Sequence, residues 1–156
     1  MISLDIPGFG KLDLLHLVSD YNGTLALDGK LLPGVAQALT ELASSLQIHV
    51  ITADTFGLAR TELDGLPVQL VITPLESQAE AKLRFVSGLG ADTVVAIGNG
   101  RNDRKMLAAA GIGVALVQRE GGSAQTLASA DVVCMNVIDV LALLRNPKRL
   151  VATLRS

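Results

Sequence analysis

The segment that decides the fold reads LLHLVSDYNGTL at residues 14–25. Its first half is apolar, and Asp20 ends that run in front of a turn that contains Gly23. Ligands of open α/β sheets bind just beyond the carboxyl ends of the strands. A carboxylate at that position can attack phosphorus and carry it as an aspartyl-phosphate. Asp is also common in turns, so this motif alone leaves two interpretations open, a nucleophile and a turn cap.

Length and composition indicate one folded domain with an aliphatic core. The chain has 156 residues, of which 49 % are hydrophobic and 3 % are aromatic. This length suits one domain with a core of its own, so we expect a single domain over residues 1–156. Because aromatic residues are so few, Ala, Val, Leu and Ile must build the core. Such a core is typical of parallel strands that are buried on both faces.

Charge and cysteine content limit the expected partners and compartment. The formal net charge is -2, which gives no broad electrostatic footprint for nucleic acid. No apolar stretch reaches the roughly 18 residues that a membrane span needs, and the segment after Met1 has no signal-peptide pattern. Cys134 is the only cysteine, so no internal disulfide can form, which fits a reducing compartment. We therefore expect a cytoplasmic protein that binds neither nucleic acid nor membranes.

Short apolar runs alternate with helical patterns along the chain, and most connections between them are short. This alternation predicts an α/β fold with three layers, in which a doubly wound parallel sheet carries helices on both faces. The first core strand should lie in the middle of the sheet. The expected strands are 13–19, 48–52, 68–72, 93–97, 112–116 and 131–135, and the expected helices are 34–46, 55–64, 76–88, 102–110, 122–129, 137–145 and 147–155.

Two short segments lie outside this alternation. Residues 2–6 predict an additional edge strand in front of Pro7-Gly8. Residues 24–32 predict a small β-hairpin after the first core strand, because Asp28-Gly29 between apolar flanks is a strong hairpin signal.

A second polar group follows the apolar run of residues 48–51. There Thr52-Ala53-Asp54 offers a hydroxyl and backbone N–H groups to a phosphate oxygen, just before a predicted helix whose N-terminus favours anions. The alternative interpretation is that Asp54 or Thr55 caps that helix. Both interpretations can hold together.

Two further features follow the predicted strands 68–72 and 93–97. Lys82 lies within a helical pattern, where a single lysine is usually a solvated surface charge. The run GNGRND at residues 98–103 carries glycines that permit close backbone approach. Its oxygen side chains suit Mg²⁺, although an ordinary loop and helix cap would look similar. A dinucleotide-binding motif is disfavoured, because Asp103 stands where a third glycine would be needed.

These four features, in this order, resemble the haloacid dehalogenase-like superfamily over roughly residues 12–135. The superfamily includes phosphatases and the phosphorylation domain of P-type ATPases. The features are Asp-x-x-Gly-Thr-Leu at Asp20, a strand-end Thr52, the helical Lys82 and Gly-x-Gly-x-Asn-Asp ending at Asp103. Thr52-Ala53-Asp54 is also similar to the Thr-Gly-Asp of P-type ATPases, so the chain looks like a soluble P-type ATPase-like subgroup.

The resemblance implies a role for each matching residue. Asp20 would be the nucleophile, and Lys82 would neutralise its charge and that of the phosphoryl group. The implied catalytic residues are Asp20, Asn22, Thr52 and Lys82, the phosphate-binding residues are Gly23, Thr52, Ala53 and Lys82, and the Mg²⁺ ligands are Asp20, Asn22 through its carbonyl, Asn99 and Asp103.

Two departures from the family pattern predict slow turnover. Phosphatases of the family usually carry Asp where this chain has Asn22, and that Asp acts as general acid and base. They also usually carry Asp where this chain has Asn99, and that Asp ligates the metal. We therefore expect a Mg²⁺-dependent phosphotransfer enzyme or slow phosphatase that acts on a phosphorylated substrate. The alternative is a non-catalytic phosphate-sensing or partner-binding module.

The sequence leaves no room for an inserted cap domain. Only the 24–32 hairpin follows the first motif, and residues 73–82 are too few for a domain. Leu25, Leu27, Leu31 and Leu32 would form an exposed apolar patch if the hairpin projected from a monomer. We therefore expect a homo-oligomer, with a tetramer favoured, in which the hairpin covers a neighbouring site. The alternative is that the hairpin folds back on its own domain.

Overall fold

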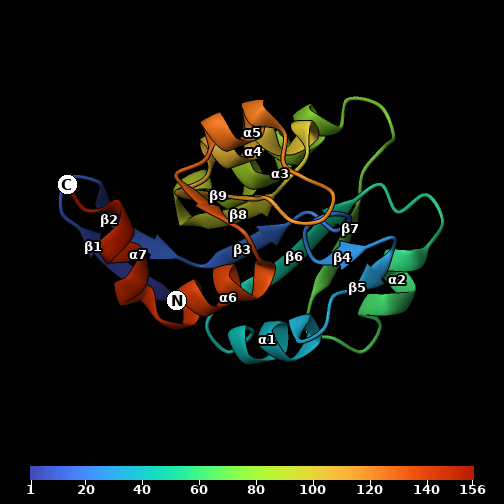
Figure 1. The fold of residues 1–156 in the computed structure, drawn as a ribbon, viewed down its shortest axis with the longest axis horizontal. Helices are drawn as coiled ribbons and strands as arrows, with labels where there is room; N and C mark the ends of the chain where they lie inside the picture. Colours follow the sequence, from blue (N-terminus) through green and yellow to red (C-terminus); the bar gives the residue numbers. More distant parts are fainter.

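Six apolar segments pair into one β-sheet in the computed structural model, which describes all 156 residues (Figure 1). They are β3 (His16–Ser19), β6 (Gln47–Thr52), β7 (Gln69–Ile72), β8 (Val94–Gly98), β9 (Ile112–Leu116) and β10 (Val132–Cys134). The order is β10-β9-β8-β3-β6-β7, and all pairings are parallel. The first core strand therefore lies in the middle of the sheet, as predicted.

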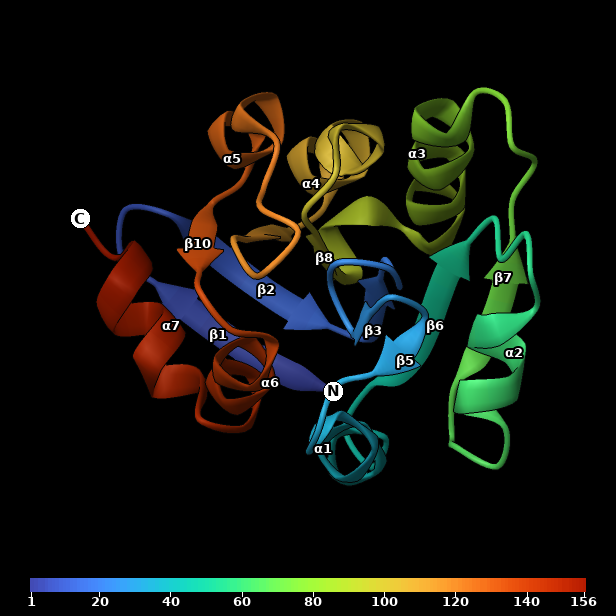
Figure 2. The same cartoon turned by 45° about the vertical axis from the view of Figure 1, so that its right-hand side comes forward.

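Helices cover both faces of the sheet, which confirms the three-layer α/β prediction. They are α1 (Val35–Leu42), α2 (Leu58–Leu63), α3 (Gln78–Leu89), α4 (Arg104–Ala109), α5 (Ala124–Ser129), α6 (Val137–Arg145) and α7 (Pro147–Leu154), with 3-10 turns η1 (Ala91–Thr93) and η2 (Arg101–Asp103). Figure 2 shows α3, α4 and α5 on one face, and α1 and α6 on the other. None of these helices is both long enough and apolar enough to cross a membrane.

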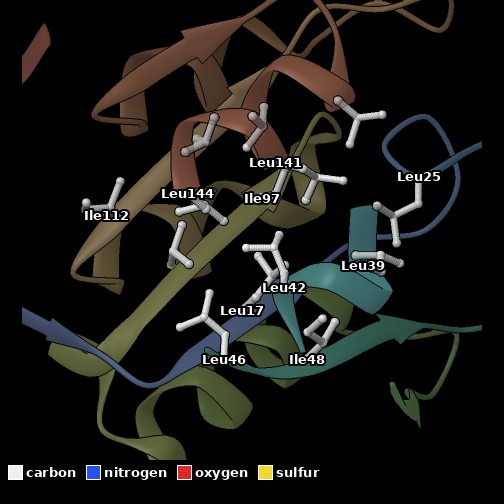
Figure 3. Packing of buried hydrophobic residues seen from close by; sticks show 14 of the residues in the cluster. Leu17, Leu25, Leu39, Leu42, Leu46, Ile48, Ile97, Ile112, Leu141 and Leu144 are labelled. Atoms are coloured by element: carbon white, nitrogen blue, oxygen red, sulfur yellow. The ribbon is translucent and has the colours of Figure 1, made fainter. Parts of the chain in front are cut away.

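Alternate residues of the central strands enter two separate cores, as expected for strands buried on both faces. Leu17 of β3 and Ile97 of β8 join the larger cluster, together with leucines of α1 and α6 (Figure 3). Val18, the next residue of β3, joins the smaller cluster with Val86 of α3 and Met106 of α4. Each central strand therefore contributes side chains to the cores on both faces of the sheet.

The predicted strand over residues 13–19 is two strands. Its first part belongs to β2 (Gly10–Leu14), which pairs antiparallel with β1 (Ile2–Ile6) in a separate two-stranded sheet. The predicted strand over residues 2–6 forms as β1, in this separate sheet and not at the edge of the main one. Leu15 separates the two strands. Its N–H donates to the carbonyl of Thr93, directly before β8, and its carbonyl accepts from Gln47 of β6. The apolar face of β1 enters the larger core, which also holds Leu150 of α7.

The predicted hairpin forms, as β4 (Ala26–Leu27) and β5 (Lys30–Leu31). Its turn residues Asp28 and Gly29 have φ of 52° and 82°, the left-handed pair that a tight hairpin turn needs. The hairpin folds back on its own domain: Leu25 is fully buried, and none of its other leucines is among the exposed apolar side chains. Leu25, Leu31 and Leu32 pack on the larger core, in line with the alternative that the hairpin folds back on its own domain. The packing of this hairpin on a neighbouring subunit stays a prediction.

Two histidines meet far from the carboxyl end of the sheet. The His16 Nδ1 and His49 Nε2 atoms of the neighbouring strands β3 and β6 lie 3.1 Å apart. The His49 ring packs edge-on against Phe85 of α3. Burial lowers the pKa of both rings below the usual 6.5, and His16 lowers the pKa of His49 further. Both imidazoles are therefore neutral in the folded protein at pH values where an unfolded chain begins to protonate them.

We expect acidification to destabilise the fold through this pair. Because the folded pKa values lie below 6.5, the unfolded chain binds more protons just below that pH, and the free energy of unfolding falls as pH falls. Between about pH 7 and about pH 5.5 the histidine pair should lower the free energy of unfolding by an amount on the order of 1 kcal/mol. Urea titrations at several pH values measure it. The double variant His16→Gln/His49→Leu should show a flatter dependence than the wild type, and equal slopes would contradict this account.

Candidate active site

A buried lysine joins two carboxylates at the carboxyl end of the sheet. Asp20 follows β3, Lys82 projects from α3 and Asp103 ends η2. The Lys82 Nζ lies 2.9 Å from Asp20 Oδ1 and 2.7 Å from Asp103 Oδ1. The Lys82 and Asp103 side chains are 1 % and 0 % exposed, whereas the Asp20 side chain keeps 12 %. Asp20 is therefore the member of the trio that a ligand can reach.

The trio carries an excess negative charge, because one ammonium faces two carboxylates. Burial alone would lower the pKa of Lys82, but the charges of Asp20 and Asp103 outweigh it and raise that pKa. Burial and the charge of Asp20 raise the pKa of Asp103 to about 7, against the opposing effect of Lys82. Lys82 is therefore firmly cationic, and the surplus charge lies on the carboxylates.

Asp103 is held entirely by donors of the protein. Its Oδ1 accepts from Lys82, and its Oδ2 accepts from the backbone N–H groups of Asn99 and Gly100 at 3.1 and 2.9 Å. Gly98 permits this approach, since a Cβ there would lie 2.4 Å from the Asp103 Cγ. Both oxygens are thus engaged, so Asp103 anchors Lys82 in this structure.

Thr24 links Asp20 to Asn99. The Thr24 Oγ1 lies 3.5 Å from Asp20 Oδ2 and 3.3 Å from Asn99 Oδ1. The Asn99 Nδ2 donates to the Gly121 carbonyl at 3.1 Å, which turns the amide oxygen toward Thr24. Gly23 lies against the same amide with φ of 78°, and a Cβ there would be 2.5 Å from the Asn99 Nδ2. The side-chain oxygens of Asp20 and Asn99 therefore both face the Thr24 hydroxyl.

The remaining predicted residues line an adjoining cleft of about 240 Å³. Asn22, Thr52 and Ala53 all contribute to it, whereas the side-chain hydrogen bonds of Asp20 go to Thr24 and Lys82. Asp54 accepts from the backbone N–H groups of Ala59 and Arg60 in the first turn of α2, so it acts as a helix cap. The structure thus gathers Asp20, Lys82, Asp103 and Asn99 directly, and places the other predicted residues on the neighbouring wall.

Three supporting residues escaped prediction from the sequence. Asn102 Oδ1 accepts from Lys82 at 3.3 Å, and Asn102 Nδ2 donates to Gln78 at 2.7 Å. Gln118 Nε2 donates to the carbonyls of Gly23 and Thr24 at 3.2 and 2.9 Å. Asn102 lay in a quoted motif and was a detectable candidate. Gln118 lies more than ninety residues from its partners, and no local pattern marks it.

The oxygen donors around Asp20 fit a weakly held hard cation. The structure contains no group of three or more His, Cys, Asp or Glu side chains that would form a strong metal centre. Asp20 and Asn99 instead supply one charged and one neutral oxygen, and Mg²⁺ accepts few protein carboxylates because it retains water. The excess negative charge of the trio also favours a cation nearby.

Sequence comparisons identify relatives of this chain. Residues 72–138 match the model of a haloacid dehalogenase-like hydrolase family. An uncharacterized protein of Methanocaldococcus jannaschii, MJ0073, is 37 % identical over 83 residues, which are 51 % of this chain and 89 % of that protein.

Structural comparisons agree with the sequence relatives. A haloacid dehalogenase superfamily hydrolase (subfamily III A) from Legionella pneumophila aligns with a TM-score of 0.72 at 19 % identity, over 90 % of this chain and 86 % of that one. The 3-deoxy-D-manno-octulosonate 8-phosphate phosphatase of Moraxella catarrhalis, in complex with magnesium, phosphate and the sugar, aligns with a TM-score of 0.66 at 21 % identity, over 90 % and 92 %. At these identities the likeness shows a shared fold. Together with the family match and the ordered motifs, it shows that this chain belongs to the haloacid dehalogenase-like superfamily.

Proposed function

We propose that this protein is a Mg²⁺-dependent phosphotransfer enzyme, a slow phosphatase that works through an aspartyl-phosphate on Asp20. The observation that carries the proposal is the partly exposed carboxylate of Asp20, held by a buried lysine that Asp103 anchors in turn. A purely structural ion pair would not need one member that remains accessible to water.

The geometry of Asp20 suits nucleophilic attack. Lys82 donates to Oδ1 at 2.9 Å. This leaves Oδ2, which the Thr24 hydroxyl approaches only to 3.5 Å, for phosphorus. Attack by Oδ2 forms the acyl phosphate, breaks the bond between phosphorus and the ester oxygen, and releases an alkoxide that takes a proton from water. Asn22 lines the adjoining cleft, but its amide cannot supply that proton as a carboxylic acid would.

The cleft beside Asp20 supplies candidate groups for the phosphoryl oxygens. The Thr52 Oγ1 accepts from the Asp54 N–H at 3.3 Å, so its own hydrogen remains free to donate. We assign phosphate binding to Thr52, the Ala53 backbone, Gly23 and Lys82. Donors fixed before the reaction stabilise the developing charge without reorganisation.

Mg²⁺ would be held by the Asp20 carboxylate, the Asn22 backbone carbonyl and the Asn99 side-chain oxygen, with Asp103 adding charge nearby. When bound, it would supply electrostatic stabilisation of the phosphoryl oxygens. The Moraxella catarrhalis phosphatase of the same fold binds magnesium and phosphate, which supports this choice of cation. The neutral amide of Asn99 should make the site weak.

Replacing Asn99 by aspartate is expected to tighten Mg²⁺ binding at least about tenfold, because added ligand charge shifts cation affinity by decades. The metal-free variant should lose about 1–3 kcal/mol of stability, since an oxygen replaces the amide that donates to the Gly121 carbonyl. Calorimetric titration and urea unfolding measure the two effects. Asn136→Asp, which adds the same charge at the start of α6, is the matched control, and an equal effect there would contradict ligation by residue 99.

A screen of phosphorylated compounds with Mg²⁺ tests the proposed function. The wild type should hydrolyse at least one class of ester slowly, and Asp20→Asn should not. Hydrolysis that survives in Asp20→Asn would contradict the role of Asp20. Tight binding of phosphate without any turnover or phosphoenzyme would favour the alternative, a phosphate-sensing module.

We also propose that the protein forms a homo-oligomer, a tetramer, and that apolar side chains beside the cleft contribute to its interface. Phe56 and Leu75 line the cleft and are 86 % and 67 % exposed, and exposed apolar patches often mark interfaces. Light scattering should show a species larger than a monomer, and Phe56→Ser/Leu75→Ser should dissociate it. Leu15→Ser, at the other end of the sheet, is the control. A monomeric wild type at micromolar concentration would contradict this proposal.

A further inference from the structure

A second cavity of about 510 Å³ opens beside the candidate active site, and the reaction described above makes no use of it. Its walls are mainly apolar, and Arg119 and Glu120 contribute polar groups. The volume lies in the range of sites for small organic ligands, which are concave and mostly apolar with a few polar groups. The apolar lining comes chiefly from Leu27, Leu32, Pro33, Met135, Val137 and Ile138.

The cavity lies at the same edge of the sheet as Asp20. Its walls come from segments that follow the carboxyl ends of β3, β9 and β10, namely residues 23–33, 118–120 and 135–138. Ligands of such sheets bind at this edge. The cavity is therefore placed to hold a part of the molecule that reacts at Asp20.

Two contacts connect the cavity to the loop that follows Asp20, at Gly23 and Thr24. Gly23, which lies against the Asn99 amide, also lines the cavity. Gln118 lines it as well, donates to the carbonyls of Gly23 and Thr24, and accepts from the Val137 N–H at 2.9 Å. One side chain thus fixes the loop that follows Asp20 against the first residue of α6. Gly23 and Thr24 thus connect the cavity lining to the residues around Asp20.

Electrostatics agree with this proximity. Burial raises the pKa of Glu120, and the charges of Asp28 at the hairpin tip and of Asp20 raise it further. Glu120, at the cavity, therefore lies within electrostatic range of Asp20 as well as of Asp28 in the hairpin.

We propose that this cavity binds the organic group of the substrate, so that the enzyme acts on phosphate monoesters of alcohols with a bulky apolar part. This inference rests on the proposed function, because it assigns the leaving group of that reaction. The phosphate would lie at Asp20, and the apolar chain or ring would lie between the hairpin and the start of α6. Such a substrate removes the apolar lining from water, whereas a small polar alcohol leaves it hydrated.

The test compares ethyl phosphate with hexyl phosphate, two esters whose leaving groups have similar basicity. Each buried methylene contributes about 0.8 kcal/mol, so kcat/KM should be at least about tenfold higher for hexyl phosphate. Ile138→Ser and Met135→Ser, each of which alters the cavity, should reduce that preference several-fold. The control is Leu15→Ser, because Leu15 and Ile138 have similar exposures of 41 % and 36 %. Met135 is 68 % exposed, so its replacement should not disturb folding.

A second readout does not depend on turnover. Hexanol should shift the methyl NMR signals of Met135 and Ile138 in the wild type. Labelling of Asp20 by acetyl phosphate, which has no long apolar group, reports the proposed function separately. Normal labelling with no preference between the esters, or a preference that the cavity variants do not change, would overturn the inference and leave the function standing. No labelling and no hydrolysis of any ester would overturn the function, and this inference with it.

Discussion

Lys82→Met is expected to lower the free energy of unfolding by about 3–5 kcal/mol, the cost of removing one partner from a buried ion pair. The reason is that Asp20 and Asp103 would then face each other without a cation, and Asp103 has no exposure to water at all. Without added metal, the decrease in the free energy of unfolding caused by Lys82→Met should be larger at about pH 8 than at about pH 6. The pKa of Asp103 is already raised to about 7. Below that pH the carboxyl takes up a proton, and the neutral group no longer leaves a buried charge without the Lys82 cation. Urea unfolding at both pH values measures the effect.

Two matched variants separate this effect from the loss of any lysine. Lys105→Met removes an ion pair with Glu80 in which the two side chains are 37 % and 47 % exposed, so it should change stability far less than Lys82→Met does. The double variant Lys82→Met/Asp103→Asn should recover part of the loss, because it removes the stranded charge. A loss below 1 kcal/mol in Lys82→Met would show that the trio is not held as the structure describes.

Asn22→Asp is expected to raise the rate of phosphoenzyme hydrolysis by about 10²-fold, near the lower end of what general acid–base catalysis contributes. Asn22 lies on the wall of the cleft and is exposed, so a carboxyl there can reach a water or a leaving group without a burial cost. Single-turnover decay of the phosphoenzyme measures the rate. Asn22→Ala is the control and should decay as slowly as the wild type. A fast wild type, with Asn22→Asp no faster, would contradict the account of slow turnover.

The sequence was most informative where polar residues follow apolar strands. The position of Asp20 after an apolar run and the glycines around Asn99 correctly predicted residues that meet at one sheet edge, because parallel strands bring their carboxyl ends together. The hairpin at Asp28-Gly29 was equally predictable, since its left-handed turn conformation demands those residue types. These features depend on residues that are adjacent in the sequence, so the sequence alone predicts them.

The remaining features depend on contacts between distant residues. The break at Leu15 has no turn signal, since the apolar run continues across it, and only pairing with β1 shows that the strand ends there. The burial of the hairpin leucines depends on which core they meet. The hydrogen bond between Thr24 and Asn99 joins residues 75 positions apart. The bonds from Gln118 to the carbonyls of Gly23 and Thr24 join residues more than 90 positions apart. Local patterns contain no information on such pairs.

Intact-mass analysis after incubation with acetyl phosphate and Mg²⁺ tests the central claim, that Asp20 carries a phosphoryl group. The wild type should gain the mass of one phosphoryl group, located on the peptide that contains Asp20, and should keep it longer than Asn22→Asp. Asp20→Asn should remain folded, because Lys82 retains its contact with Asp103, and should gain no mass. A wild type that binds Mg²⁺ but takes up no phosphoryl group, or an Asp20→Asn protein that still becomes labelled, would contradict the account.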